Sequence, residues 1–161
     1  MSDHILTINA GSSSLKFALF TAGALECVAG GQIDGLGTDP NLVVKDGKGQ
    51  RLLADALDGE RFVADHDGAL HTVLGVVHDR FPQARVAAVG HRVVHGGIDF
   101  AAPVLVAGEL MQRLVALIPL APLHQPHNLA GIAAAQAAFP GVPQVACFDT
   151  AFHREIGRAH V

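Results

Sequence analysis

The stretch "ILTINAGSSSLKFALF", residues 5–20, places a group of small residues between two apolar runs. The apolar residues on either side are typical of strands. Gly11 and the three serines after it favour a tight turn that offers backbone N–H and hydroxyl groups. Such a turn can bind phosphate oxygens with Lys16 as the counter-charge, although it lacks the spacing of a Walker A loop. We expect a hairpin whose turn faces phosphate, with an ordinary glycine-serine turn as the alternative.

Composition narrows the class of protein. The chain has 161 residues, 50% hydrophobic and 16% charged, which fits one domain with a sizeable core and excludes a disordered chain. Its formal net charge is −4 and no run of lysine or arginine occurs, so neither nucleic acid nor a membrane is expected as a partner. Cys27 and Cys147 match no metal or disulfide framework. No leader peptide or membrane-spanning run is recognisable, so a cytoplasmic location is expected.

Hydrophobic periodicity predicts a mixture of strands and helices in the rest of the chain. Further strands are expected at 25–33, 42–44, 85–90 and 142–148, and helices at 67–81, 108–118 and 128–139. A proline directly follows each predicted helix and is expected to end it. This order of elements favours an α/β protein with a mixed sheet and helices packed on it.

The motif "GHRVVHGG", residues 90–97, directly follows a predicted strand. Arg92 is therefore expected at the edge of the sheet, where open α/β sheets commonly bind ligands. An arginine there can hold a carboxylate or a phosphate through two hydrogen bonds. His91 and His95 do not fit a zinc site, because the glutamate of H-E-x-x-H is missing and strand-then-glycine geometry separates the two rings. We expect solvated or structural histidines.

Two later motifs also carry polar residues. In "APLHQPHN", residues 121–128, His124 is expected to project from a proline-bracketed loop, and Asn128 to cap the helix that follows. A plain loop histidine is the alternative. In "VACFDTAFH", residues 145–153, Asp149 ends a buried strand and is a candidate for metal or general-base chemistry. The alternative is a helix-capping or turn aspartate.

Together these motifs resemble acetate kinases, in the acetate and propionate kinase group of the sugar kinase, actin and Hsp70-type superfamily. The matching strings are "TINAGSSSLKF", "GHRVVHGG", "APLHQPHNLAGI" and "VACFDTAFH", in the family's order from residue 5 to residue 153. The resemblance implies a ribonuclease H-like (actin-like ATPase) domain over residues 1–153, with a mixed five-stranded sheet and flanking helices. It also implies that the whole enzyme is a homodimer.

The resemblance implies a role for each matching position. They are Asn9 at the Mg²⁺ site; Ser12, Ser14 and Lys16 at the phosphates of ATP or ADP; Arg92 at the acetate carboxylate; Val94 and Leu123 beside the methyl group; His124 near the transferring phosphoryl group; and Asp149 as the catalytic aspartate. The implied reaction is reversible transfer of phosphate from ATP to acetate, giving acetyl phosphate. This chemistry depends mainly on positioning and charge neutralisation.

The chain also departs from the family's pattern. Acetate kinases have two domains, and the adenosine-binding part, a second histidine and arginine, and a metal-site glutamate have no counterpart here. We therefore expect the isolated chain to have negligible activity. Residues 154–161 lie beyond the resemblance and are expected to come from a truncation or a translated sequencing adapter, with a natural tail as the alternative. The alternative functions are a propionate kinase, or a non-catalytic domain that binds phosphate, acetyl phosphate or a protein partner.

Overall fold

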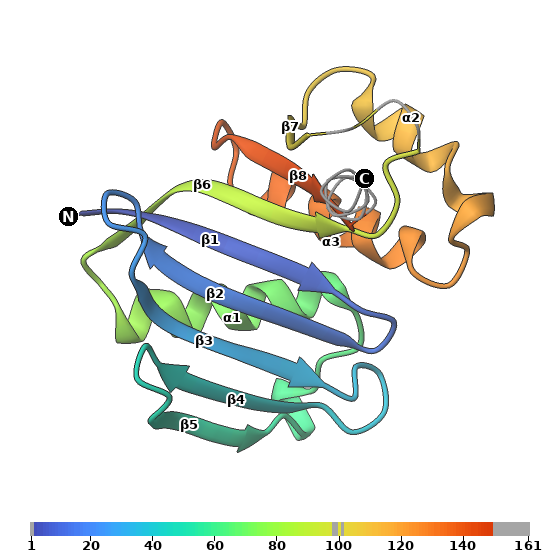
Figure 1. The fold of residues 1–161 in the computed structure, drawn as a ribbon. Helices are drawn as coiled ribbons and strands as arrows, with labels where there is room; N and C mark the ends of the chain where they lie inside the picture. Colours follow the sequence, from blue (N-terminus) through green and yellow to red (C-terminus); the bar gives the residue numbers. More distant parts are fainter. Residues whose placement is uncertain (1, 98–99, 101, 150–161) are drawn as a thin grey trace, which may run out of the picture.

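An eight-stranded mixed sheet organises the chain, seen in a computed structural model that describes residues 2–97, 100 and 102–149 (Figure 1). The strands are β1 (Ser2–Ala10), β2 (Ser14–Thr21), β3 (Cys27–Asp34), β4 (Asn41–Asp46), β5 (Arg51–Ala56), β6 (Ala84–Val93), β7 (Val104–Leu105) and β8 (Gln144–Phe148). Their order across the sheet is β5-β4-β3-β2-β1-β6-β8-β7. The β1–β6 and β6–β8 pairs are parallel and the remaining pairs are antiparallel. The mixed α/β sheet is confirmed, but the predicted number of five strands is wrong.

The extra strands have a physical explanation. The sequence of β5, "RLLADA", lacks the strict alternation of a half-buried strand and is rich in residues that favour helices. Pairing with β4 nevertheless makes it a strand, because a neighbouring strand edge can override local propensity. β7 pairs with β8 at the far edge of the sheet. It has only two residues, too few to show a periodic pattern in the sequence.

The opening hairpin forms as predicted. β1 and β2 are antiparallel neighbours, with Asn9 opposite Lys16. The turn closes where the N–H of Gly11 donates to the carbonyl oxygen of Ser14 over 2.9 Å. Because directly opposed residues point to the same face of a sheet, Asn9 and Lys16 share one face.

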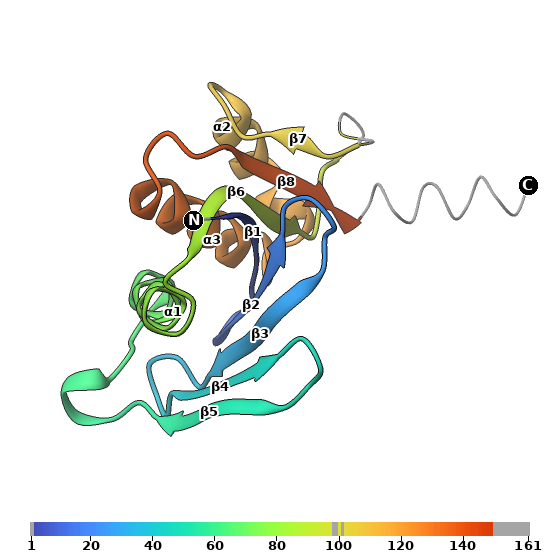
Figure 2. The same ribbon diagram turned by 90° about the vertical axis from the view of Figure 1, so that its left-hand side faces the viewer.

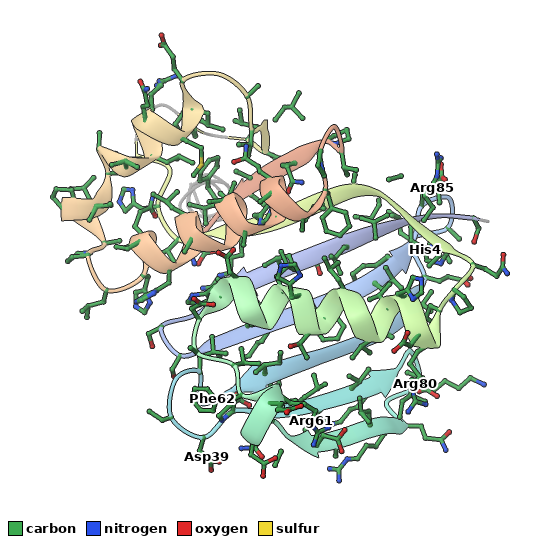
Figure 3. The ribbon with its side chains drawn as sticks, turned by 180° about the vertical axis from the view of Figure 1, so that it is seen from behind. His4, Asp39, Arg61, Phe62, Arg80 and Arg85 are labelled. Atoms are coloured by element: carbon green, nitrogen blue, oxygen red, sulfur yellow. The ribbon has the colours of Figure 1, made fainter. Side chains whose placement is uncertain are left out.

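Helices α1 (His66–Arg80) and α3 (Gln125–Ala138) pack against the other face of the sheet (Figure 3). Asp65 caps α1 by accepting a hydrogen bond from Gly68 N over 2.8 Å. The short helix α2 (Leu110–Val115) ends before Pro119, which lies in a 3-10 turn at Ile118–Leu120. None of the helices in the described part of the chain is long and apolar enough to cross a membrane.

Among the described residues, helices cover the sheet on one side only (Figure 2). Buried residues of β1 and β2, such as Leu6, Ile8 and Leu19, face α1 and α3 and form the larger core. A smaller core, which includes Leu114, Ile132 and Ala146, lies between α2, α3 and β8. Figure 2 shows α1 and α3 on one side of the strands and, for the residues described, no helix on the other. This bare side, called the open face below, carries Asn9 and Lys16.

Candidate active site

A hollow of about 510 Å³ lies on the open face, over the ends of β1, β2, β6 and β8. Its polar lining includes Asn9, Lys16, Arg92, Cys147 and Asp149. The register explains this grouping, since Asn9 is opposite Lys16 and Arg92 is opposite Cys147. β1, β6 and β8 are parallel, so their carboxyl ends deliver these side chains to one edge of the sheet.

Arg92 and Asp149 form an ion pair in this hollow. Arg92 Nε donates to both Asp149 carboxylate oxygens over 3.0 Å, and Nη2 donates to Oδ2 over 2.6 Å. These hydrogen bonds raise the pKa of Arg92 above its ordinary value, and partial burial opposes them. Within the described residues Nη1 makes no hydrogen bond to protein, so its two N–H groups are not used by Asp149.

The structure brings four of the nine predicted site residues to the hollow and leaves five outside it. The four are Asn9, Lys16, Arg92 and Asp149; the five are Ser12, Ser14, Val94, Leu123 and His124. Val94 directly follows β6 and is half-buried. Leu123 is 74% exposed, and His124 is an exposed residue at the start of α3. The described residues therefore do not close an acyl pocket around Val94 and Leu123.

The turn at residues 11–14 is held from two sides. His66 Nε2 donates to the carbonyl oxygen of Gly11 over 2.7 Å, and Leu36 N donates to the carbonyl oxygen of Ser13 over 3.0 Å. Ser12 is exposed and Ser14 is half-buried. The turn is thus anchored through the carbonyl groups of Gly11 and Ser13.

The donor chemistry of the hollow fits Mg²⁺. Asn9 offers an amide oxygen and Asp149 a carboxylate, both hard oxygen ligands, and both line the same hollow. Across residues 2–97, 100 and 102–149, no three His, Cys, Asp or Glu side chains converge on one point. A cation held here would take its other ligands from water and from substrate phosphate, as Mg²⁺ commonly does.

The lining of the hollow also includes a buried histidine, His91, and the sequence left open whether this residue is solvated or structural. His91 is 2% exposed, and its Nε2 donates to Gln144 Oε1 over 2.7 Å. Burial lowers the pKa of His91, and the hydrogen bond to Gln144 partly offsets that effect. His91 is therefore a structural histidine. His95 has a different partner, because its Nδ1 accepts a hydrogen bond from Gly97 N over 2.9 Å.

The predicted helix cap at Asn128 is wrong. α3 begins at Gln125, three residues earlier, so Asn128 lies inside its first turn. Instead of capping, the Asn128 side chain contacts the ends of two strands: its Nδ2 donates to Ala10 O and its Oδ1 accepts from Val94 N, both over 2.8 Å. An asparagine ahead of an alanine-rich run is a good cap by local criteria, so only the tertiary contacts distinguish the two roles.

The fold matches that of acetate and propionate kinases. A propionate kinase from Francisella tularensis aligns with a TM-score of 0.82 and 35% sequence identity, over 95% of this chain and 38% of that chain. An acetate kinase from Porphyromonas gingivalis aligns with a TM-score of 0.82 and 33% identity, over 94% of this chain and 38% of that one. The sequence model of the acetokinase family matches residues 4–161. The chain belongs to the acetokinase family.

Curated relatives give the same assignment and show how much of them the chain covers. An acetate kinase from Methylocella silvestris is 46% identical over 96% of this chain and 40% of its own length. One from Deinococcus radiodurans is 47% identical over 92% of this chain and 36% of its own length. The chain thus spans about two fifths of these relatives. The family match runs through the predicted boundary at 153/154, which lies outside the described residues and stays a prediction.

Proposed function

We propose that the chain is the N-terminal part of an ATP-dependent acetate kinase, and that the hollow binds the reacting carboxylate and phosphoryl groups. The observation that carries this proposal is the Arg92–Asp149 ion pair, which lies in one hollow with Asn9 and Lys16. These are the parts that phosphoryl transfer to a carboxylate requires: a guanidinium for the acceptor, oxygen ligands for Mg²⁺, and a cation for phosphate charge.

In the proposed reaction an acetate oxygen attacks the γ-phosphorus of ATP. The bond between that phosphorus and the β–γ bridging oxygen breaks, and ADP leaves with the electron pair. Arg92 orients acetate through the Nη1–Nη2 edge while Asp149 holds the Nε–Nη2 edge. Acetate is already ionised near neutral pH, so the step needs no general base. Asp149 and Asn9 would instead hold Mg²⁺, which neutralises phosphate charge.

The remaining predicted residues would act on the same substrates. Ser12 and Ser14 would bind nucleotide phosphate together with Lys16, and His124 would lie near the transferring phosphoryl group. Val94 and Leu123 would form one wall of an acyl pocket. Because Leu123 is exposed in this chain, another part of the protein would have to supply the other walls. Such an incomplete wall does not by itself select acetate over propionate. The proposal includes ATP, acetate and acetyl phosphate as ligands, a homodimeric whole enzyme and a cytoplasmic location.

A fusion protein tests the proposal directly. In it, this chain replaces the matching N-terminal 40% of the Methylocella silvestris acetate kinase. We expect this fusion enzyme to form acetyl phosphate from ATP, Mg²⁺ and acetate, as measured by hydroxamate trapping. Parallel assays with propionate give the acyl preference. A folded fusion enzyme that binds phosphate or acetyl phosphate without turnover would instead favour the non-catalytic binding domain.

A further inference from the structure

Two buried amide side chains occupy the first turn of α3. Gln125 is fully buried and Asn128 is 4% exposed. They are three residues apart, so they share one face of the helix. Because unpaired amide groups are costly in a protein interior, residues buried to this degree must have polar partners.

Asn128 bridges the ends of β1 and β6. Its Nδ2 donates to the carbonyl oxygen of Ala10, which directly follows Asn9, over 2.8 Å. Its Oδ1 accepts from the N–H of Val94, two residues beyond Arg92, also over 2.8 Å. One side chain is therefore bonded to the chain at the ends of two of the strands, β1 and β6, that carry polar groups into the hollow.

Two further observations show that α3 is fixed tightly against these strands. Gln125 Nε2 donates to the carbonyl oxygen of His95 over 2.9 Å, and its Oε1 accepts from His95 N over 3.3 Å. A Cβ atom added at Gly131 would lie 3.0 Å from the Cβ of Ala10, closer than side chains normally approach. The helix, the end of β1 and the segment after Arg92 thus form one tightly held unit.

We propose that Asn128, supported by Gln125, is a positioning residue that sets the separation between the phosphate-facing turn after Ala10 and the segment after Arg92. The proposal rests on the proposed function, since these are the parts that would hold phosphoryl donor and carboxylate acceptor. An apolar residue at 128 would leave the Ala10 carbonyl and the Val94 N–H unpaired, and the two strand ends would lose their common anchor. Misplacement of reacting groups by about 1 Å can cost roughly a hundredfold in rate.

Amide hydrogen exchange in the whole 161-residue chain tests the anchor without any substrate. In Asn128→Ala, we expect the Val94 N–H to exchange at least about tenfold faster, the size of effect expected for one lost buried hydrogen bond. Amides of residues 11–14 should lose protection as well, while those of β4 and β5 should not change. In Asn128→Asp, ionised near pH 8, Val94 should stay protected because a carboxylate still accepts its N–H, but the bond to Ala10 is lost.

Gln144→Ala is the matched control. Gln144 is also a 4% exposed amide, and its Nε2 also donates to α3, at Ala135 O. Its Oε1 accepts from His91 inside β6, but Gln144 bonds to neither Ala10 nor Val94. We expect this variant to lower stability without selective loss of protection at Val94. If Asn128→Ala changes exchange uniformly, as Gln144→Ala does, or leaves Val94 within about twofold of its original rate, the positioning proposal is overturned.

Kinetics of the fusion enzyme test whether Asn128 matters for catalysis. Asn128→Ala should lower kcat by about a hundredfold with a much smaller change in the KM for ATP, whereas Gln144→Ala should stay within about threefold. If Asn128→Ala exposes Val94 but keeps kcat within about threefold, the residue is structural and the proposal is overturned. If the unsubstituted fusion enzyme itself makes no acetyl phosphate, the proposed function fails, and the exchange experiment alone decides whether Asn128 holds the strand ends.

Discussion

Arg92 and Asp149 contact each other through three hydrogen bonds although 57 positions separate them in the sequence. β6 and β8 are parallel neighbours, so the two residues reach the same side of the sheet from adjacent strand ends. The carboxylate fixes the guanidinium by its Nε–Nη2 edge. The proposed acceptor carboxylate would therefore meet an arginine whose orientation is already set, which would reduce the entropy lost on binding.

Replacing Arg92 should affect acetate more than ATP. In the fusion enzyme we expect Arg92→Ala to raise the KM for acetate and to lower kcat, each by about tenfold or more, because the fork that orients acetate is gone. The KM for ATP should change by less than about threefold, since Lys16 and Mg²⁺ are expected to bind that end. Steady-state kinetics with acetate and with ATP as the varied substrate measure the two KM values and kcat.

Arg92→Lys is the control that keeps the positive charge of the side chain and removes its two-donor geometry. Lysine restores the positive charge but cannot offer two parallel N–H donors, so rescue should be partial. A variant whose main defect is ATP binding would place Arg92 outside the acetate site.

The ion pair should matter little for stability. Its side chains are 51% exposed for Arg92 and 30% exposed for Asp149, so solvent screens the interaction. A double-mutant cycle in the 161-residue chain with Arg92→Ala and Asp149→Ala, followed by urea denaturation, should give a coupling free energy of about 1 kcal/mol or less. A coupling several times larger would mean that the pair is retained for folding, and its assignment to the site would lose support.

The isolated chain should turn over acetate negligibly. It spans about two fifths of its relatives, and the resemblance implies that a second histidine and arginine lie elsewhere in the protein. Loss of even one preorganised charge-stabilising donor typically costs about a hundredfold or more in rate. Hydroxamate trapping with the purified chain measures this, and the Arg92→Ala chain reveals any contaminating kinase. Acetyl phosphate formation that depends on Arg92 would show this prediction to be wrong.

The sequence predicted the elements with strong local patterns. The β1–β2 hairpin and α1 lie where alternation and helical spacing placed them, and Asp149 follows a buried strand as expected. β5 was missed because its residues carry no alternation and depend on pairing with β4.

The site was predictable only in part, for the same reason. The resemblance identified Arg92 and Asp149 separately, and neither local sequence nor motif spacing indicates that they form an ion pair. Asn128 was assigned to a cap because capping is a local signal, whereas its partners Ala10 and Val94 lie 118 and 34 positions away. Contacts of this kind depend on the packing of α3 against the sheet, which local patterns do not encode.

The buried His91 should make stability depend on pH. Burial holds its folded-state pKa below the ordinary value of 6.5, so the unfolded chain binds a proton more readily than the folded one. Stability contributed by neutral His91 is therefore complete above about pH 6.5 and is lost as the pH falls through the lowered pKa. Tm measured by circular dichroism between about pH 7.5 and pH 5 should fall with acidity.

His91→Gln isolates this contribution from those of the other histidines. Glutamine can still donate to Gln144 but does not titrate, so the decline of Tm toward acid pH should be shallower than in the unsubstituted chain. Equal slopes in the two proteins would mean that His91 does not protonate differently in the folded and unfolded states.

Asp149→Asn should separate metal binding from base catalysis. The substitution keeps the shape of the side chain and removes its charge. It should therefore weaken the binding of Mg²⁺ by residues 9 and 149, whereas proton transfer should be unaffected because the proposal gives Asp149 no part in it. In the fusion enzyme we expect kcat to fall about a hundredfold and the Mg²⁺ concentration for half-maximal rate to rise about tenfold. The shape of the remaining pH–rate profile should not change, because acetate arrives ionised. Unchanged demand for Mg²⁺, together with loss of the acidic limb of that profile, would instead identify Asp149 as a general base.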